Sequence, residues 1–244
     1  MADELIIYVA DAGSVSKDNF HWVCSRDVET SAIDPRALAA AVALDLNSGN
    51  RVALGYESPL FVPADRDPNS LGRSRDGECQ QATGNRPFTA GAGAAVLATG
   101  IQSIAWVLRE TKHLAPNATA STRWADFRGG ACPLFVWEAF VSGSEKAYPP
   151  SHGGDAALAI AAFRQVSSRD DNPTRVHCSK AFSLVGAAVV WSGLSNDLTL
   201  LAEPCVVLRP LFSEQEAKER LAGHKLRQAE AAKAKAAKNK GDAK

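Results

Sequence analysis

Residues 5–13 read LIIYVADAG, a short apolar run that ends in an acid and a turn. Its aliphatic, β-branched and aromatic side chains favour a strand, and the Asp-Ala-Gly end favours a turn directly after it. The next run with strand character covers residues 20–26. Together the two runs predict a β-hairpin at the start of the chain.

Later segments extend this hairpin into a larger sheet. Asp34, followed by proline, predicts the N-cap of a helix, and residues 51–57, RVALGYE, predict the next strand. Residues 134–140, LFVWEAF, predict an aromatic-rich strand. Residues 155–163, DAALAIAAF, predict a helix whose small side chains allow close packing on a sheet. We therefore expect an α/β protein with a mixed sheet flanked by helices.

Other segments give weaker signals. Residues 65–87 are polar and have no sustained period, which predicts a long loop of the kind that often binds ligands. Residues 116–128 predict an irregular or weakly extended segment. Residues 182–194 are mainly apolar and have an ambiguous period, and we favour a buried helix for them.

The C-terminal part differs in composition from the rest. We expect a main domain over residues 1–212 and a basic, partly disordered helical tail over 213–244, opened by a capping-box pattern at Ser213 and Glu216. The tail contains nine Lys or Arg and five Asp or Glu, whereas the whole chain has 27 of each kind. An acidic body with a basic tail is compatible with a nucleic-acid partner, although a solvated helix has the same composition.

Cysteine usage and hydropathy indicate the compartment. The five cysteines are far apart and form no C-x-x-C pair, which is typical of reduced thiols in the cytoplasm. The start of the chain lacks the pattern of a secretory signal, and the longest apolar run is shorter than the ~20 residues of a membrane helix. We expect a cytoplasmic protein with no membrane partner, and the oligomeric state stays open.

Four acidic residues lie within or at the ends of apolar segments: Asp11, Glu57, Glu138 and Asp155. Carboxylates gathered from several strand ends and a helix start are suited to Mg²⁺ or Mn²⁺, which prefer oxygen ligands. We expect Asp11, Glu138 and Asp155 to be metal ligands and Glu57 an auxiliary catalytic acid. Each acid has an ordinary alternative: Asp155 as a helix cap, Asp11 as a turn residue, Glu57 in a salt bridge, and Glu138 facing solvent.

Four arginines share the polar loop: Arg66, Arg73, Arg75 and Arg86. Guanidinium groups match the geometry of phosphate, so these side chains are candidates for substrate binding. Gly91 and Gly93 before the next helix are a weak anion-binding signal, and His152 is a candidate proton carrier. A solvated loop is the alternative reading. The motifs of serine hydrolases, zinc proteases, Walker nucleotide sites and dinucleotide-binding folds are missing from the sequence.

The succession YVADAG, GYESPLFVP, LFVWEAF and HGGDAALAIAAF resembles an uncharacterised-domain family of predicted ribonuclease-H-like nucleases. The resemblance covers residues 5–210 and implies a ribonuclease-H-like fold, with the four acids above as candidate metal-binding residues. At Glu57 this chain departs from the family, which more often has aspartate there. The resemblance implies a Mg²⁺- or Mn²⁺-dependent nuclease or phosphodiesterase. A non-catalytic binding or scaffolding module and an actin-like phosphotransferase stay open, because fold does not imply function.

Overall fold

The computed structural model describes residues 4–64, 66–78, 88–89, 92–149, 151–166 and 170–241, without the side chains at 92, 228 and 231–241. The described strands are β1 (Leu5–Ala12), β2 (Phe20–Cys24), β3 (Asp27–Ala32), β4 (Arg51–Glu57), β5 (Phe61–Pro63), β6 (Ala120–Ser121), β7 (Leu134–Ala139), β8 (Ala181–Ser183) and β9 (Val207–Leu208). The α-helices are α1 (Pro35–Asn47), α2 (Ala92–Leu114), α3 (Trp124–Arg128), α4 (His152–Arg164), α5 (Leu184–Trp191) and α6 (Glu214–Gly241). Short 3₁₀ turns include η3 (Gly143–Glu145).

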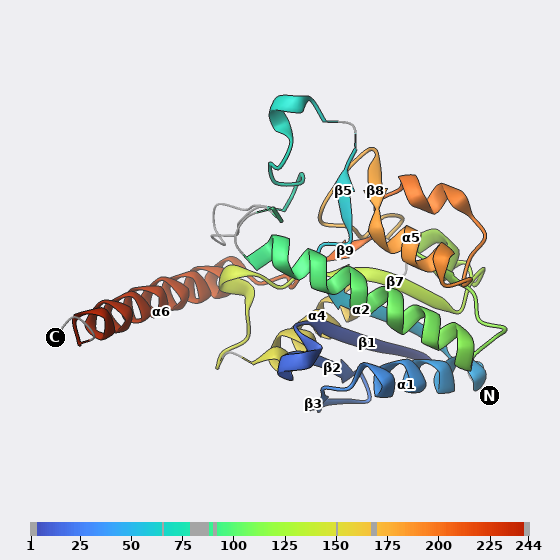
Figure 1. Ribbon diagram of the computed structural model, residues 1–244, viewed down its shortest axis with the longest axis horizontal. Coiled ribbons are helices and arrows are strands. Elements are labelled where there is room, and N and C mark those ends of the chain that lie inside the picture. Colours follow the sequence, from blue (N-terminus) through green and yellow to red (C-terminus); the bar gives the residue numbers. More distant parts are fainter. Residues whose placement is uncertain are drawn as a thin grey trace.

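The main sheet has seven strands of mixed direction (Figure 1). Its order is β3-β2-β1-β4-β7, and both β6 and β9 pair with β7. β1 runs antiparallel to β2, as the predicted hairpin requires, and parallel to β4, which in turn is parallel to β7. The prediction of a mixed sheet flanked by helices is confirmed, and the arrangement is consistent with a ribonuclease-H-like α/β fold.

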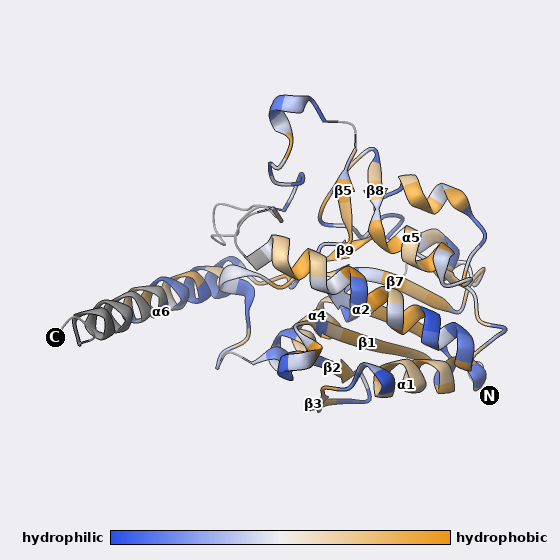
Figure 2. Ribbon diagram, in the orientation of Figure 1, coloured by the Kyte–Doolittle hydropathy of each residue, from blue (hydrophilic) through white to orange (hydrophobic). Residues whose placement is uncertain are grey.

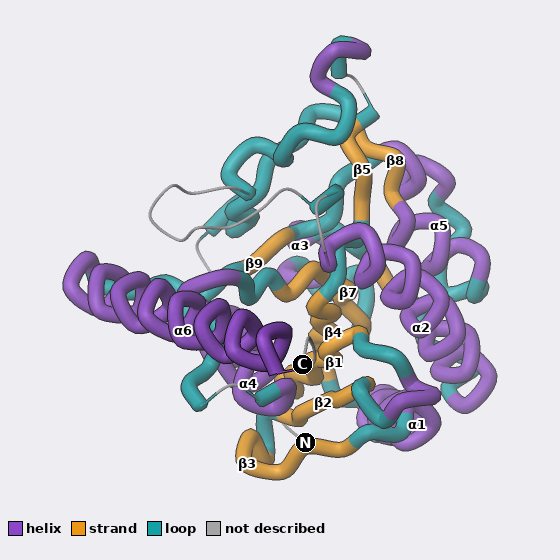
Figure 3. The backbone as a smooth tube through the Cα atoms, turned by 60° about the vertical axis from the view of Figure 1, so that its left-hand side comes forward, coloured by secondary structure: helices purple, strands orange, loops and turns teal. Residues whose placement is uncertain are grey.

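Helices cover both faces of this sheet because successive strand side chains point to opposite faces. Ile6 and Tyr8 of β1 belong to one core cluster, shared with α1 and α2. Ile7 and Val9 belong to a second cluster, shared with α4. Figure 3 shows α1 and α2 on one side of the strands and α4 on the other. The central strands are correspondingly apolar in Figure 2.

The predicted helix starts are largely confirmed. The Asp34 side chain caps α1 by accepting a hydrogen bond from the backbone N–H of Arg36 at 2.9 Å. At the start of α6, Glu216 accepts from the backbone N–H of Ser213 at 2.8 Å, and Ser213 Oγ accepts from the N–H of Glu216 at 3.3 Å. The expected basic tail is therefore a capped helix, and in Figure 1 it projects away from the sheet.

Three segments differ from the sequence predictions. Residues 27–32 form β3, a strand that the sequence did not indicate because it is an edge strand with mostly polar side chains. The segment expected to be irregular, 116–128, contains the short strand β6 and the helix α3. The apolar run 182–194 begins inside β8 before it becomes the helix α5. Within the described residues, no helix is long and apolar enough to cross a membrane.

Candidate metal centre

Asp11 and Glu57 lie side by side on neighbouring parallel strands. Asp11 is the penultimate residue of β1, Glu57 is the last residue of β4, and the two are directly opposite in the ladder. In-register residues on adjacent strands point to the same face of a sheet. That face is covered by α4, since Val9 and Ala53, two and four residues earlier on the same strands, belong to the cluster that α4 shares.

Asp155 comes to this point from the first turn of α4. The helix is capped by Ser151, whose Oγ accepts from the backbone N–H of Gly154 at 3.0 Å. The alternative reading of Asp155 as the N-cap is therefore wrong. Its Oδ1 accepts from the backbone N–H of Ala147 at 2.7 Å, which fixes the carboxylate against the loop that precedes α4.

Together Asp11, Glu57 and Asp155 form what we call the three-acid site. One carboxylate oxygen of each residue lies within 4.8 Å of the others. The side chains are only 12%, 12% and 6% exposed, respectively. Carboxylates this close repel one another strongly when they are shielded from water, so the site favours a cation.

Lys146 supplies a positive charge at the site. Its Nζ lies 2.7 Å from Oδ2 of Asp155 and 3.3 Å from Oε1 of Glu57. Burial lowers the pKa of Lys146, but the charges of Glu57 and Asp155 more than offset this and raise the pKa above its ordinary value. The ammonium group is therefore stable at neutral pH.

Glu57 is the most perturbed of the three acids. Burial, and then the negative charge of Asp11, raise the pKa of Glu57 well above its usual range, although Lys146 opposes the shift. Its Oε2 is fully buried and has no hydrogen-bond partner among the described residues. A buried acceptor without a partner is costly, so this oxygen is available to a ligand.

Two histidines adjoin the carboxylates. Nδ1 of His152 forms a short hydrogen bond with Oδ2 of Asp11. The imidazole rings of His21 and His152 stack with their centroids 4.9 Å apart, and Nδ1 of His21 lies 3.0 Å from Oγ of Ser31. Burial, and then the electrostatic influence of the adjacent His152 ring, lower the pKa of His21. The His152 side chain is 46% exposed, so it connects Asp11 with solvent.

The donor set of the three-acid site fits a metal ion. It offers carboxylate oxygens from three residues, which are the ligands that hard divalent cations prefer. Oε2 of Glu57 is an unpaired acceptor within it, and Lys146 already places a cation against two of the acids. This buried acidic group has the ligand atoms needed to hold a metal ion.

Glu138, which was predicted as a metal ligand, lies outside the three-acid site. It pairs in register with Tyr56, one residue before Glu57, and therefore points to the opposite face of the sheet. Its two oxygens accept hydrogen bonds from Arg75 at 2.6 and 2.8 Å, and one of them also accepts from the backbone N–H of Leu60 at 2.9 Å. Glu138 thus belongs to a buried ion pair.

Arg75, which was predicted to bind substrate, is the other half of that pair. Its side chain is completely buried, and it also contacts Glu78 at 3.2 Å. Its guanidinium carbon lies 4.6 Å from the centroid of the Phe61 ring. A guanidinium enclosed in this way cannot reach a substrate, so Arg75 has a structural role.

The other loop arginines differ in position. The Arg66 guanidinium donates hydrogen bonds to the backbone carbonyls of Arg73 and Ser74 at 2.5 and 2.6 Å. These bonds stabilise the loop that follows β5. Arg73 has an exposed side chain. Arg86 lies outside the described residues, as does Gly91 of the predicted glycine pair.

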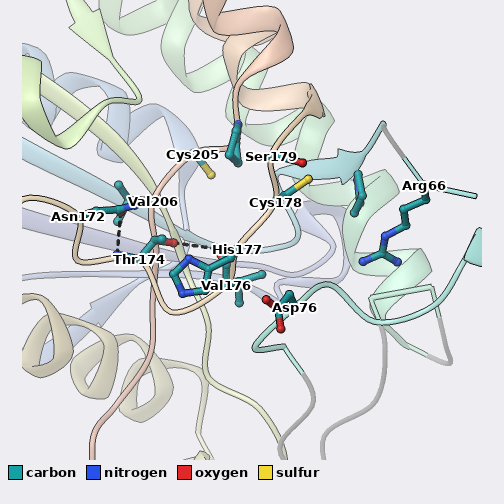
Figure 4. Close-up of a pocket in the computed structure, with 12 residues that line it drawn as sticks. Arg66, Asp76, Asn172, Thr174, Val176, His177, Cys178, Ser179, Cys205 and Val206 are labelled. Carbon is teal, nitrogen blue, oxygen red and sulfur yellow. Dashed lines mark hydrogen bonds between the residues drawn. The ribbon is translucent and has the colours of Figure 1, made fainter.

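Arg66 also lines a cavity of about 520 Å³ (Figure 4). Its wall also includes Asp76, Asn172, Thr174, residues 176–179 and residues 204–206. The backbone N–H of His177 donates to the carbonyl of Asp76 at 2.8 Å and joins two of these segments. None of the three acids lines the cavity, which is therefore separate from the three-acid site.

The sequence did not single out Lys146 or His21. His21 lies opposite Asp11 in the β1–β2 ladder, so the register of the predicted hairpin was a signal that could have identified it. Lys146 belongs to the loop between η3 and α4 and matches no motif. Comparisons of the chain with protein-family models, with curated proteins and with solved structures find no match.

Proposed function

We propose that this protein is a divalent-metal-dependent phosphodiesterase that cleaves nucleic acid. The observation that carries the proposal is the three-acid site, in which carboxylates from two adjacent strand ends and one helix converge around the ammonium group of Lys146. An all-oxygen ligand set favours Mg²⁺ or Mn²⁺ over softer metals.

The residues of the site have distinct roles in this proposal. Asp11 and Glu57 present oxygens to the metal, and Ala147 orients Asp155 through its backbone N–H. When bound, the metal activates a water molecule and stabilises the leaving oxygen of a phosphodiester. His152 holds or exchanges a proton beside Asp11, because its ring touches the carboxylate and is also partly exposed.

Two features support nucleic acid as the substrate class. A single ammonium at a carboxylate site can pair with a phosphate oxygen, and Lys146 is 47% exposed. The second feature is the composition of α6, since residues 231–241 contain four lysines and no acid. The sequence resemblance to ribonuclease-H-like nucleases agrees with the same class.

Calorimetric titration with Mn²⁺, followed by cleavage assays on single- and double-stranded DNA and RNA, tests the proposal. We expect the wild type to bind Mn²⁺ and to cleave at least one of these substrates. Asp11→Asn and Asp155→Asn should lose both properties while remaining folded. Asp171→Asn is the matched control, because the Asp171 side chain is 92% exposed.

The outcomes separate the proposal from its alternative. A wild type that neither binds Mn²⁺ nor cleaves any of the four substrates would contradict it and would favour a binding or scaffolding module. Cleavage that survives in both Asn variants would place the reaction elsewhere in the molecule.

A further inference from the structure

Lys146 is held in the three-acid site from both sides along the chain. On one side, Glu145 forms a buried ion pair with Arg209. Oε1 of Glu145 accepts hydrogen bonds from Nε of Arg209 at 2.9 Å and from Nη2 of Arg209 at 2.6 Å. On the other side, the backbone N–H of Ala147 donates to Asp155. These anchors restrain the backbone on both sides of Lys146, and the contacts of Nζ with Asp155 and Glu57 hold the ammonium group in the site.

The helix α6 restrains the same loop from outside. Nη1 of Arg220 donates to the backbone carbonyl of Lys146 at 3.3 Å. The guanidinium carbon of Arg227 lies 4.9 Å from the centroid of the Tyr148 ring. The loop that carries Lys146 is therefore contacted by the sheet, by α4 and by α6.

The net charge of the three-acid site limits the number of divalent ions that it can bind. Once a bound metal has displaced the proton of Glu57, the three ionised carboxylates and the ammonium group of Lys146 carry a formal net charge of −2. One divalent ion balances that charge, whereas a second would leave the site positive before any substrate arrives. Two-metal phosphodiesterases place their second ion where the reacting oxygens need positive charge.

The carboxylate oxygens of the site also divide into those that contact Lys146 and one that is left for a metal ion. Lys146 contacts Oδ2 of Asp155 and Oε1 of Glu57. Oε2 of Glu57 has no partner among the described residues and is left for an ion. The ammonium group and a metal can therefore occupy the site together on different oxygens.

We propose that Lys146 takes the place of a second metal ion, so that the three-acid site binds one divalent cation and Lys146 supplies the other positive charge to a substrate phosphate. This inference rests on the proposed function and specifies its metal stoichiometry.

Counting bound Mn²⁺ tests the inference without any substrate. Calorimetry, with electron paramagnetic resonance of free Mn²⁺ as a second count, is applied to the full-length wild type, Lys146→Gln, Lys146→Arg and the control Lys225→Gln. Lys225 is exposed on α6. Circular dichroism checks that each variant is folded.

We expect one ion in the wild type, in Lys146→Arg and in Lys225→Gln, and two ions in Lys146→Gln. The first ion should also bind Lys146→Gln about tenfold more tightly, because a neighbouring positive charge is gone. Two ions in the wild type would overturn the inference, since the metal would then displace Lys146, but would leave the proposed function standing. One ion in folded Lys146→Gln would also overturn the inference and leave the proposed function standing. No ion in the wild type would overturn both. Should Lys146→Gln not fold, two ions in the wild type or in folded Lys146→Arg would still overturn the inference.

Discussion

Arg75 and Glu138 form a two-point ion pair in the interior of the protein, with nitrogen–oxygen distances of 2.6 and 2.8 Å. Both side chains are completely buried. The pair joins β7 to the loop that follows β5. Glu138 was predicted to bind a metal and Arg75 to bind substrate, but together they connect two parts of the fold.

Removing one partner of this pair should destabilise the protein strongly. Arg75→Met leaves the Glu138 carboxylate buried without a counter-charge, which costs ~3–5 kcal/mol in comparable pairs. We expect urea denaturation to show a loss of that size in the free energy of unfolding, and Glu138→Leu in the same chain to restore part of it. The exposed Arg73→Met should stay within ~0.5 kcal/mol of the wild type. A loss below ~1 kcal/mol for Arg75→Met would contradict the role assigned to the pair.

Stability should depend on pH through Glu57. Because the folded state raises the pKa of Glu57 well above its usual range, the folded protein binds more protons than the unfolded chain between the two pKa values. The stability that protonated Glu57 contributes is fully present below the unfolded pKa of ~4.3 and is lost as pH rises through the folded pKa. We expect the free energy of unfolding of Glu57→Gln to fall less steeply with pH across that window. Identical slopes for the variant and the wild type would refute the burial argument.

Metal binding should be coupled to the same proton. A metal that takes the oxygens of Glu57 displaces its proton, so Mn²⁺ affinity should rise with pH through the folded pKa of Glu57. Calorimetry in buffers of different ionisation enthalpy measures the proton release directly. We expect release in the wild type and in the Asp171→Asn control. A binding enthalpy that is independent of the buffer would mean that Glu57 is not a ligand.

Gly154 should be required for the shape of the site. A Cβ at this position would lie 2.7 Å from Cβ of Ala147 and 2.6 Å from Oγ of Ser151. Gly154→Ala should therefore push the loop away from Asp155, destabilise the fold by ~1–3 kcal/mol and weaken Mn²⁺ binding. Gly223→Ala in α6 is the control, since its Cβ would meet only the flexible end of Arg227, and it should not reduce stability. Normal Mn²⁺ affinity in Gly154→Ala would show that the loop contact is dispensable.

His152 should affect the reaction more than metal binding. Its ring touches Asp11 but contributes no atom to the three-acid site. We expect His152→Ala to bind Mn²⁺ within a few-fold of the wild type and to cleave substrate about 10²- to 10⁴-fold more slowly, with a changed pH–rate profile. An equal loss of Mn²⁺ affinity and rate would instead make His152 a positioning residue for Asp11.

Parts of the site follow from local patterns and parts do not. Asp11 and Glu57 lie at the C-terminal ends of predicted strands. The parallel pairing of β1 with β4 is therefore enough to bring them together at the same end of the sheet. Glu138 shows where this reasoning stops. It also lies near the end of a strand, but a register offset of one residue turns it to the other face.

The sequence by itself determined the elements that carry the three acids, because strand runs, caps and helical periods are local properties of the chain. It indicated β1, α1, β4, β7, the helix that carries Asp155 and the capped start of α6. Only the tertiary structure decided which charges share an environment. Lys146 lies in the three-acid site and Arg75 lies in the interior because of how their loops pack on the sheet. The energy of a charged side chain depends on its burial and on neighbouring groups, and those groups are distant in sequence.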